Sequence, residues 1–92
     1  MKKVILIGYS GHALVVAEIL MQKGYEIYGY LDKKESDNNL LKIPYLGFER
    51  EPGVLRRIKD IEVFPAIGDN QIRSEVMLFM HQQGFSIPLV IS

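Results

Sequence analysis

The sequence contains no cysteine, which excludes both a disulfide framework and a zinc site built on thiolates. The two histidines, His12 and His81, are too far apart in the chain to form a helical metal-binding pair, so we expect no metal. Net charge is lacking as well. The 11 basic and 11 acidic side chains cancel, and no broad basic surface for a nucleic acid is expected.

Long apolar runs are also missing. No stretch approaches the roughly 20 apolar residues that a membrane-spanning helix needs. The basic start at Met1–Lys3 is followed by an apolar run that ends at Gly8, which is too short for a signal peptide. We therefore expect a cytoplasmic protein without a membrane partner. Since 48% of the 92 residues are hydrophobic and no linker or repeat is visible, residues 1–92 are expected to form a single domain.

The most informative stretch is the first turn of the chain. Val4–Ile7 is a continuous apolar run, as in a parallel strand that is covered on both faces. It stops at Gly8, and a helical apolar pattern begins near Ala13. This arrangement presents backbone N–H groups and a helix N-terminus to an anion, so it predicts a phosphate-bearing ligand, the alternative being a purely structural turn. The dinucleotide-binding fingerprint Gly-x-Gly-x-x-Gly/Ala is incomplete here. Ser10 occupies the position of its second glycine, and the next glycine in the chain is Gly11, one residue later.

A second strand is predicted over Tyr25–Leu31, where aromatic and apolar residues gather. Asp32 follows it, 24 residues after Gly8, close to the spacing at which an acid accepts hydrogen bonds from ribose hydroxyls. The alternative for Asp32 is a surface turn residue. Lys33 either steers a phosphate or is a solvated charge.

The rest of the chain continues to alternate between strands and helices. Pro44 and Pro65 each limit ladder bonding, so the segment at 43–47 is expected at a sheet edge and Pro65 is unexpected inside a strand. The predicted elements are a short strand or extended segment at 43–47, a helix at 51–59 with Pro52 in its first turn, a strand at 61–68, a helix from Asp69 or Asn70 to Gln83, and a fifth strand at 85–91.

This alternation predicts an α/β fold, a small Rossmann-like parallel sheet of order 3-2-1-4-5 flanked by helices. In that order the turns at Gly8 and Gly68 lie side by side where the strand order reverses, which is where such sheets bind ligands. Arg73 suits a phosphate, or an ion pair with Asp69, and Asn70 suits a ligand or the helix cap equally. The expected ligand-contacting residues are Gly8, Tyr9, Ser10, Gly11, His12, Asp32, Lys33, Gly68, Asp69, Asn70 and Arg73.

Taken together, these motifs resemble a known family. Gly-Tyr-Ser-Gly-His-Ala at 8–13, Tyr-Leu-Asp at 30–32 and Ile-Gly-Asp-Asn-Gln-Ile-Arg at 67–73 are similar to the N-terminal domain of NeuD/PglD-type sugar acetyltransferases, over all 92 residues. The chain departs from the family pattern at Tyr9, where a small residue is common, and at Lys33, where a second acid is frequent.

The resemblance implies a domain that binds a nucleotide-linked sugar, commonly a UDP-amino sugar, for acetylation in surface-glycan or sialic-acid-type sugar biosynthesis. In the family a β-helix domain follows, which forms homotrimers, binds acetyl-CoA and carries the catalytic histidine. By resemblance this segment therefore has no cofactor and no catalytic residue of its own, and His12 is not the base. Gly8, Ser10, Gly11 and His12 would surround the diphosphate or sugar, and Asp32 would contact the uridine.

Two other functions remain open from the sequence. A stand-alone nucleotide-binding module without catalysis fits the absence of a visible nucleophile–base pair. A fragment of an NAD(P)-binding oxidoreductase would need a glycine in place of Ser10 and further strands.

Overall fold

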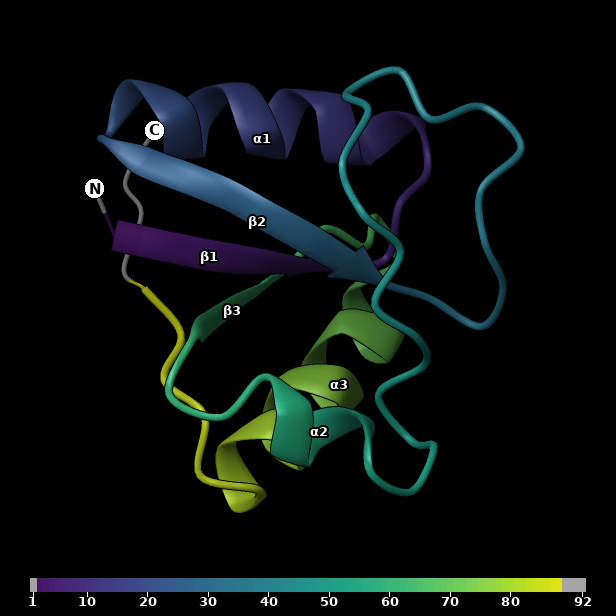
Figure 1. Cartoon of the computed structure of the whole chain (residues 1–92), viewed down its shortest axis with the longest axis vertical. Coiled ribbons are helices and arrows are strands. Elements are labelled where there is room, and N and C mark those ends of the chain that lie inside the picture. Colours follow the sequence, from purple (N-terminus) through teal and green to yellow (C-terminus); the bar gives the residue numbers. More distant parts are fainter. Residues whose placement is uncertain (1, 89–92) are drawn as a thin grey trace.

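Three strands form one parallel sheet in the order β2-β1-β3 in the computed structural model, which describes residues 2–88. Helix α1 covers one face of the sheet, and α2 and α3 lie on the other (Figure 1). The predicted α/β class with a parallel sheet flanked by helices is confirmed. The elements are β1 Lys2–Ile7, α1 Gly11–Gln22, β2 Tyr25–Leu31, α2 Val54–Arg57, β3 Glu62–Pro65 and α3 Asn70–Gln82.

The central strand β1 is buried on both faces, as its apolar run predicts. Val4 and Leu6 pack in the cluster under α1, together with the fully buried ring of Tyr30. Ile5 and Ile7 point to the opposite face and pack in the cluster that includes residues of α2 and α3. Because successive side chains of a strand alternate between its faces, this single strand joins two cores and holds its carboxyl end rigidly.

The five-strand order 3-2-1-4-5 is not confirmed. The segment at 43–47 is extended and lies against β2, with Tyr30 N donating to Pro44 O over 3.0 Å, but only Tyr45 forms a ladder bridge. This segment can lie so close to β2 only because residue 29 is glycine, since a Cβ there would lie 2.9 Å from Pro44 O. At the other edge Val63 N donates to Ser86 O over 3.0 Å, yet residues 85–88 form no strand. The remainder of the expected fifth strand, 89–91, lies outside the described residues.

The helix expected at 51–59 is wrong in extent. Only Val54–Arg57 is helical, because Gly53 before it adopts a left-handed φ of 87° and Pro52 belongs to the preceding turn. Val54 and Ile58 are nevertheless buried. Pro65 lies at the end of β3 rather than inside a longer strand. Since Ala66 N donates to Ile7 O over 2.8 Å, alternation turns the Pro65 nitrogen away from β1, so no bond to that strand is lost.

Candidate functional site

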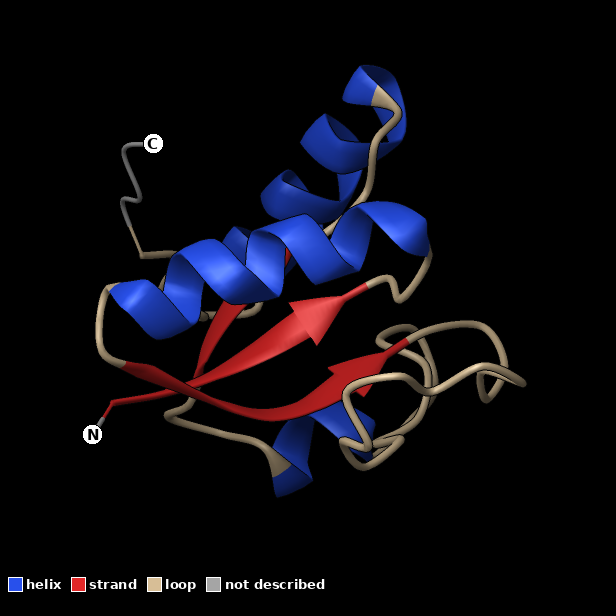
Figure 2. Ribbon diagram, turned by 90° about the horizontal axis from the view of Figure 1, so that it is seen from above, coloured by secondary structure: helices blue, strands red, loops and turns tan. Residues whose placement is uncertain are grey.

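The site is built where β1 and β2 end and their loops begin, and both loops gather at the same end of the sheet (Figure 2). Gly8 has a φ of 90°, and its N–H donates to Leu31 O over 2.7 Å. A Cβ at this position would lie 2.8 Å from Ile67 Cγ1, in the loop after β3. Glycine is therefore required here both by the left-handed backbone and by the close contact between three segments.

The N-terminus of α1 is open. Ser10 is its N-cap residue in an extended conformation, but the Ser10 side chain makes no cap hydrogen bond, and the first turn contains no acidic residue. At Gly11 a Cβ would meet no atom within 4 Å, so the backbone faces open space. Free N–H groups and the positive end of the helix dipole together suit an anion such as a phosphate.

The other helix at this edge is already capped. The Oδ1 atom of Asp69 accepts a hydrogen bond from Ile72 N over 2.9 Å, so Asp69 is the cap of α3 and Asn70 is its first helical residue. Asn70 accepts a hydrogen bond from Nη2 of Arg73, whose Nη1 donates to Ile67 O over 3.3 Å. Arg73 is thus held by Asn70 and a backbone carbonyl, and the predicted ion pair between Arg73 and Asp69 does not form in the described structure.

Asp32 connects β2 to the glycine turn. Its Oδ2 accepts from Tyr9 N over 3.1 Å, and its Oδ1 accepts from Lys33 N over 2.7 Å. Each carboxylate oxygen can accept a further hydrogen bond, so the residue positions the loop and still offers acceptors to a ligand. It is also half-buried, as a residue at the rim of a cleft would be.

The side chain of Tyr9 turns away from the turn that carries it. Its ring stacks on Tyr30 with the ring centroids 4.3 Å apart. Its hydroxyl donates to Asn39 Oδ1 over 2.7 Å and accepts from Leu41 N over 2.9 Å. Tyr9 therefore anchors the polar loop after β2, and the ring on which it stacks belongs to the protein itself.

A cavity of about 270 Å³ lies at the carboxyl ends of the three strands. It brings together six of the predicted ligand-contacting residues, namely Gly8, Tyr9, Ser10, Asp32, Lys33 and Gly68. Gly11 lines an adjacent hollow of about 130 Å³. A Cβ at Gly68 would meet nothing within 4 Å, so packing does not require glycine there.

Glu49 also lines the 270 Å³ cavity, and the sequence did not single it out. Only 7% of the residue is exposed, and its Oε1 atom has no hydrogen-bond partner in the protein. Burial raises the pKa of the carboxyl group; its own backbone amide and then the charges of Arg50 and Lys33 oppose the rise, and Asp32 adds to it. A single glutamate after an apolar segment carries no sequence signal that could have identified it.

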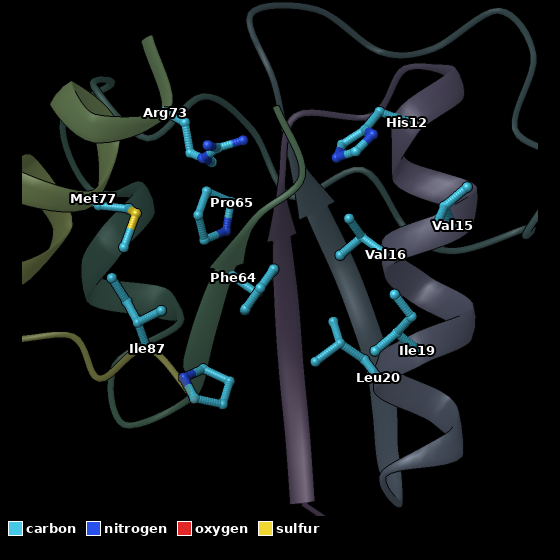
Figure 3. Close-up of a pocket in the computed structure, with 11 residues that line it drawn as sticks. His12, Val15, Val16, Ile19, Leu20, Phe64, Pro65, Arg73, Met77 and Ile87 are labelled. Atoms are coloured by element: carbon cyan, nitrogen blue, oxygen red, sulfur yellow. The ribbon is translucent and has the colours of Figure 1, made fainter. Parts of the chain in front are cut away.

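A larger cavity of about 690 Å³ opens on the α1 face, between α1 and β3. Figure 3 shows His12 and Arg73 on opposite sides of its upper end, with apolar side chains such as Val16 and Phe64 below them. His12 is exposed at the start of α1. The 270 Å³ cavity is lined by Gly8 and Gly68, and the 690 Å³ cavity is lined by His12 and Arg73, which follow these glycines in the chain.

The described part of the chain holds no group of three His, Asp or Glu side chains placed to bind a metal ion. None of its helices has the length and apolar character needed to cross a membrane.

The fold of this chain is similar to part of two solved structures from Caulobacter crescentus. A mutant of perosamine N-acetyltransferase from Caulobacter crescentus, in complex with CoA and GDP-perosamine, matches with a TM-score of 0.76 at 30% sequence identity. PerB from the same organism, also in complex with CoA and GDP-perosamine, matches with a TM-score of 0.73 at 31% identity. In both cases the match covers 92% of this chain and 40% of the other, so the chain spans less than half the length of these relatives.

A comparison with curated proteins found no match. The model of the PglD N-terminal domain family, in contrast, matches residues 3–78, which include the glycine turn, Asp32 and the first part of α3. The similarity predicted from the sequence motifs is confirmed, and the chain belongs to the PglD N-terminal domain family.

Proposed function

We propose that the chain binds a nucleoside diphosphate sugar, as the N-terminal domain of a bacterial sugar acetyltransferase that acts in surface-glycan or sialic-acid-type sugar biosynthesis. The observation that carries the proposal is the open N-terminus of α1, which follows the turn at Gly8 and lies beside Asp32. A diphosphate needs donors and positive potential, and this turn supplies both without a competing cap.

The ligand would lie across the glycine turn. The diphosphate is assigned to the backbone at Ser10–His12, because the N–H groups of Gly8 and Tyr9 already donate to Leu31 O and Asp32 Oδ2. The ribose is assigned to the free acceptor positions of Asp32. The sugar would extend toward His12 and Arg73 at the mouth of the 690 Å³ cavity, where the Arg73 guanidinium can also reach a phosphate. The nucleobase would enter the 270 Å³ cavity on the opposite side of the turn.

The acetyl transfer itself is assigned to the part of such a protein that this chain does not represent. The first relative named above is a perosamine N-acetyltransferase, both structures hold CoA, and this chain covers 40% of the length of each. The role of the domain would be to hold the sugar in place for an acetyl-CoA-dependent step, in which proximity supplies much of the rate and a general base removes the proton. A stand-alone binding module is the second candidate.

Calorimetric titration tests the binding function. GDP, UDP, UDP-N-acetylglucosamine and NADH would each be titrated into the wild-type chain and into Asp32→Ala and His12→Ala. Saturable binding of a nucleoside diphosphate that both substitutions weaken supports the proposal. Preference for NADH would instead support an oxidoreductase fragment, and no binding at all would overturn a nucleotide site. Acetyl-CoA turnover by a longer form of the gene product would distinguish the acetyltransferase from the stand-alone module.

A further inference from the structure

Glu49 is the only buried charged residue in the part of the chain that the structure describes. A carboxylate oxygen taken out of water without a partner destabilises a folded protein, since its lost hydration is not replaced. The Oε1 atom of Glu49 is in that position. Neither the strand pairing nor the glycine turn uses this residue, so the fold gives no reason for a carboxylate here.

The surroundings of Glu49 point to a planar ligand group. Its cavity is also lined by the charged residues Asp32 and Lys33 and by apolar side chains, which include Phe48, Ile67 and Ile72. Ile72 is 51% exposed, so this apolar side chain is open to solvent at the cavity. Apolar walls with a small number of polar groups are typical of ligand-binding sites, and such walls can cover the faces of a flat heterocycle. The volume of about 270 Å³ suits one part of a ligand, because sites for whole ligands measure roughly 300–1,000 Å³.

We propose that Glu49 recognises the base of a guanosine diphosphate sugar, by accepting hydrogen bonds from the guanine N1–H and N2–H groups. This inference rests on the proposed function and deepens it by naming the nucleotide. The two oxygens of a carboxylate match two parallel donors, and a charged acceptor strengthens both bonds. The ligand would thereby supply the partner that Oε1 lacks within the protein.

The other common bases do not offer this pair of donors. Uracil presents one N–H group between two carbonyl oxygens, so a carboxylate that faces it meets at least one acceptor. Adenine and cytosine each present an amino group next to a ring nitrogen that accepts. A buried site that requires two donors discriminates strongly against a base that lacks one, because a polar group is then left unpaired.

The test compares three nucleotides on three proteins. GDP, UDP and inosine diphosphate, which lacks the 2-amino group, are titrated at one salt concentration into wild type, Glu49→Gln and the control Glu75→Gln. Glu75 is an exposed glutamate of α3, so its variant removes one carboxylate charge outside the cavity. We expect the wild type and the control to bind GDP at least about 10-fold more tightly than the other two nucleotides. In Glu49→Gln most of that preference should disappear, since the amide presents an acceptor to only one donor.

The outcomes distinguish a failure of base recognition by Glu49 from a failure of the nucleotide site itself. Equal affinity for GDP and inosine diphosphate, tighter binding of UDP, or an undiminished GDP preference in Glu49→Gln would overturn base recognition by Glu49 and leave the nucleotide site standing. Failure of all three nucleotides to bind would overturn both proposals. If Glu49→Gln does not fold, the comparison of GDP with inosine diphosphate on the wild type decides alone.

Discussion

The Oδ2 atom of Asp32 accepts a hydrogen bond from the backbone N–H of Tyr9 over 3.1 Å, which ties the end of β2 to the glycine turn after β1. The same carboxylate accepts from Lys33 N through its other oxygen. One residue thus fixes the relative positions of the loop assigned to the diphosphate and the strand end assigned to the ribose. Stability and binding should both depend on it.

Asp32→Ala should lower the free energy of unfolding by about 1 to 2 kcal/mol, because two backbone N–H groups lose their acceptor. It should also weaken nucleotide binding. The ribose contact is tested separately with 2′-deoxy-GDP, which should bind the wild type less tightly than GDP does. If Asp32 contacts the ribose, the difference in affinity between GDP and 2′-deoxy-GDP should be smaller in Asp32→Ala than in the wild type. An unchanged difference in affinity would exclude Asp32 from the ribose site.

Gly11 and Gly8 should respond differently to alanine. Gly11→Ala adds a methyl group where no atom lies within 4 Å, so chemical denaturation should show wild-type stability or a gain of up to about 1 kcal/mol from the better helix former. Nucleotide affinity should fall about 10-fold or more, since the methyl group stands where the diphosphate approaches the backbone.

Gly8→Ala is the matched comparison. Its Cβ would clash with Ile67 and would force alanine into a left-handed conformation, so the variant should be destabilised by more than about 1 kcal/mol. Wild-type affinity in Gly11→Ala would contradict the placement of the diphosphate at α1.

Arg73→Ala should weaken the binding of a nucleoside diphosphate sugar by about 10-fold, through loss of a charge-assisted hydrogen bond. The slope of affinity against salt concentration should also decrease. Its stability should change by less than about 1 kcal/mol, because the Asn70 and Ile67 contacts are close to solvent. Arg56→Ala, on the exposed side of α2, is the charge-matched control and should bind normally. A similar loss of affinity in both variants would indicate only a general charge effect.

Tyr9→Phe should loosen the polar loop after β2 and leave the glycine turn intact. The hydroxyl donates to Asn39 and accepts from Leu41 N, and the stacking on Tyr30 does not need it. Amide hydrogen exchange at Leu41 should become faster, with a loss of about 1 to 2 kcal/mol in the free energy of unfolding. Unchanged exchange at Leu41 would show that the loop is held by other contacts.

The buried carboxyl group of Glu49 gives the stability of the chain a pH dependence. Its pKa is raised in the folded state, chiefly by burial, so the folded protein holds this proton more tightly than the unfolded chain does. Stability from this residue is therefore present at acid pH and is lost as the pH rises from the ordinary glutamate pKa of about 4.3 through the raised value.

Thermal unfolding across this pH range checks the sign. The melting temperature of Glu49→Gln relative to wild type should increase with pH and level off above the raised pKa of Glu49, with Glu75→Gln as the control for loss of a carboxylate. A relative melting temperature that falls with pH would mean that the Glu49 carboxylate is stabilised in the fold. Saturating GDP should reduce the difference in melting temperature between Glu49→Gln and wild type, because the ligand would provide the partner that Glu49 Oε1 lacks.

The glycine turn and the central strand could be predicted from the sequence, since a continuous apolar run ending in Gly8 has a local cause. Asp32 was located by its spacing, but its bonds to Tyr9 and Lys33 depend on how the loops fold. The elements that failed are those decided by tertiary contacts. Gly53 stops a helix that the apolar pattern favours. Residues 43–47 are the extended edge segment that was expected, but they do not complete a further strand of the sheet. Glu49 was missed because burial of a single carboxylate has no periodic signal.

The most direct test of the central claim follows the backbone amides of the chain by heteronuclear NMR during titration with GDP. The account predicts saturable binding, with the largest shifts at the amides of Gly8–Ala13 and at Asp32, and smaller shifts at Phe48 and Glu49. These are the residues of the open turn and of the cavity beside it. No saturable change, or shifts confined to surfaces away from the glycine turn, would contradict a nucleotide site at the start of α1.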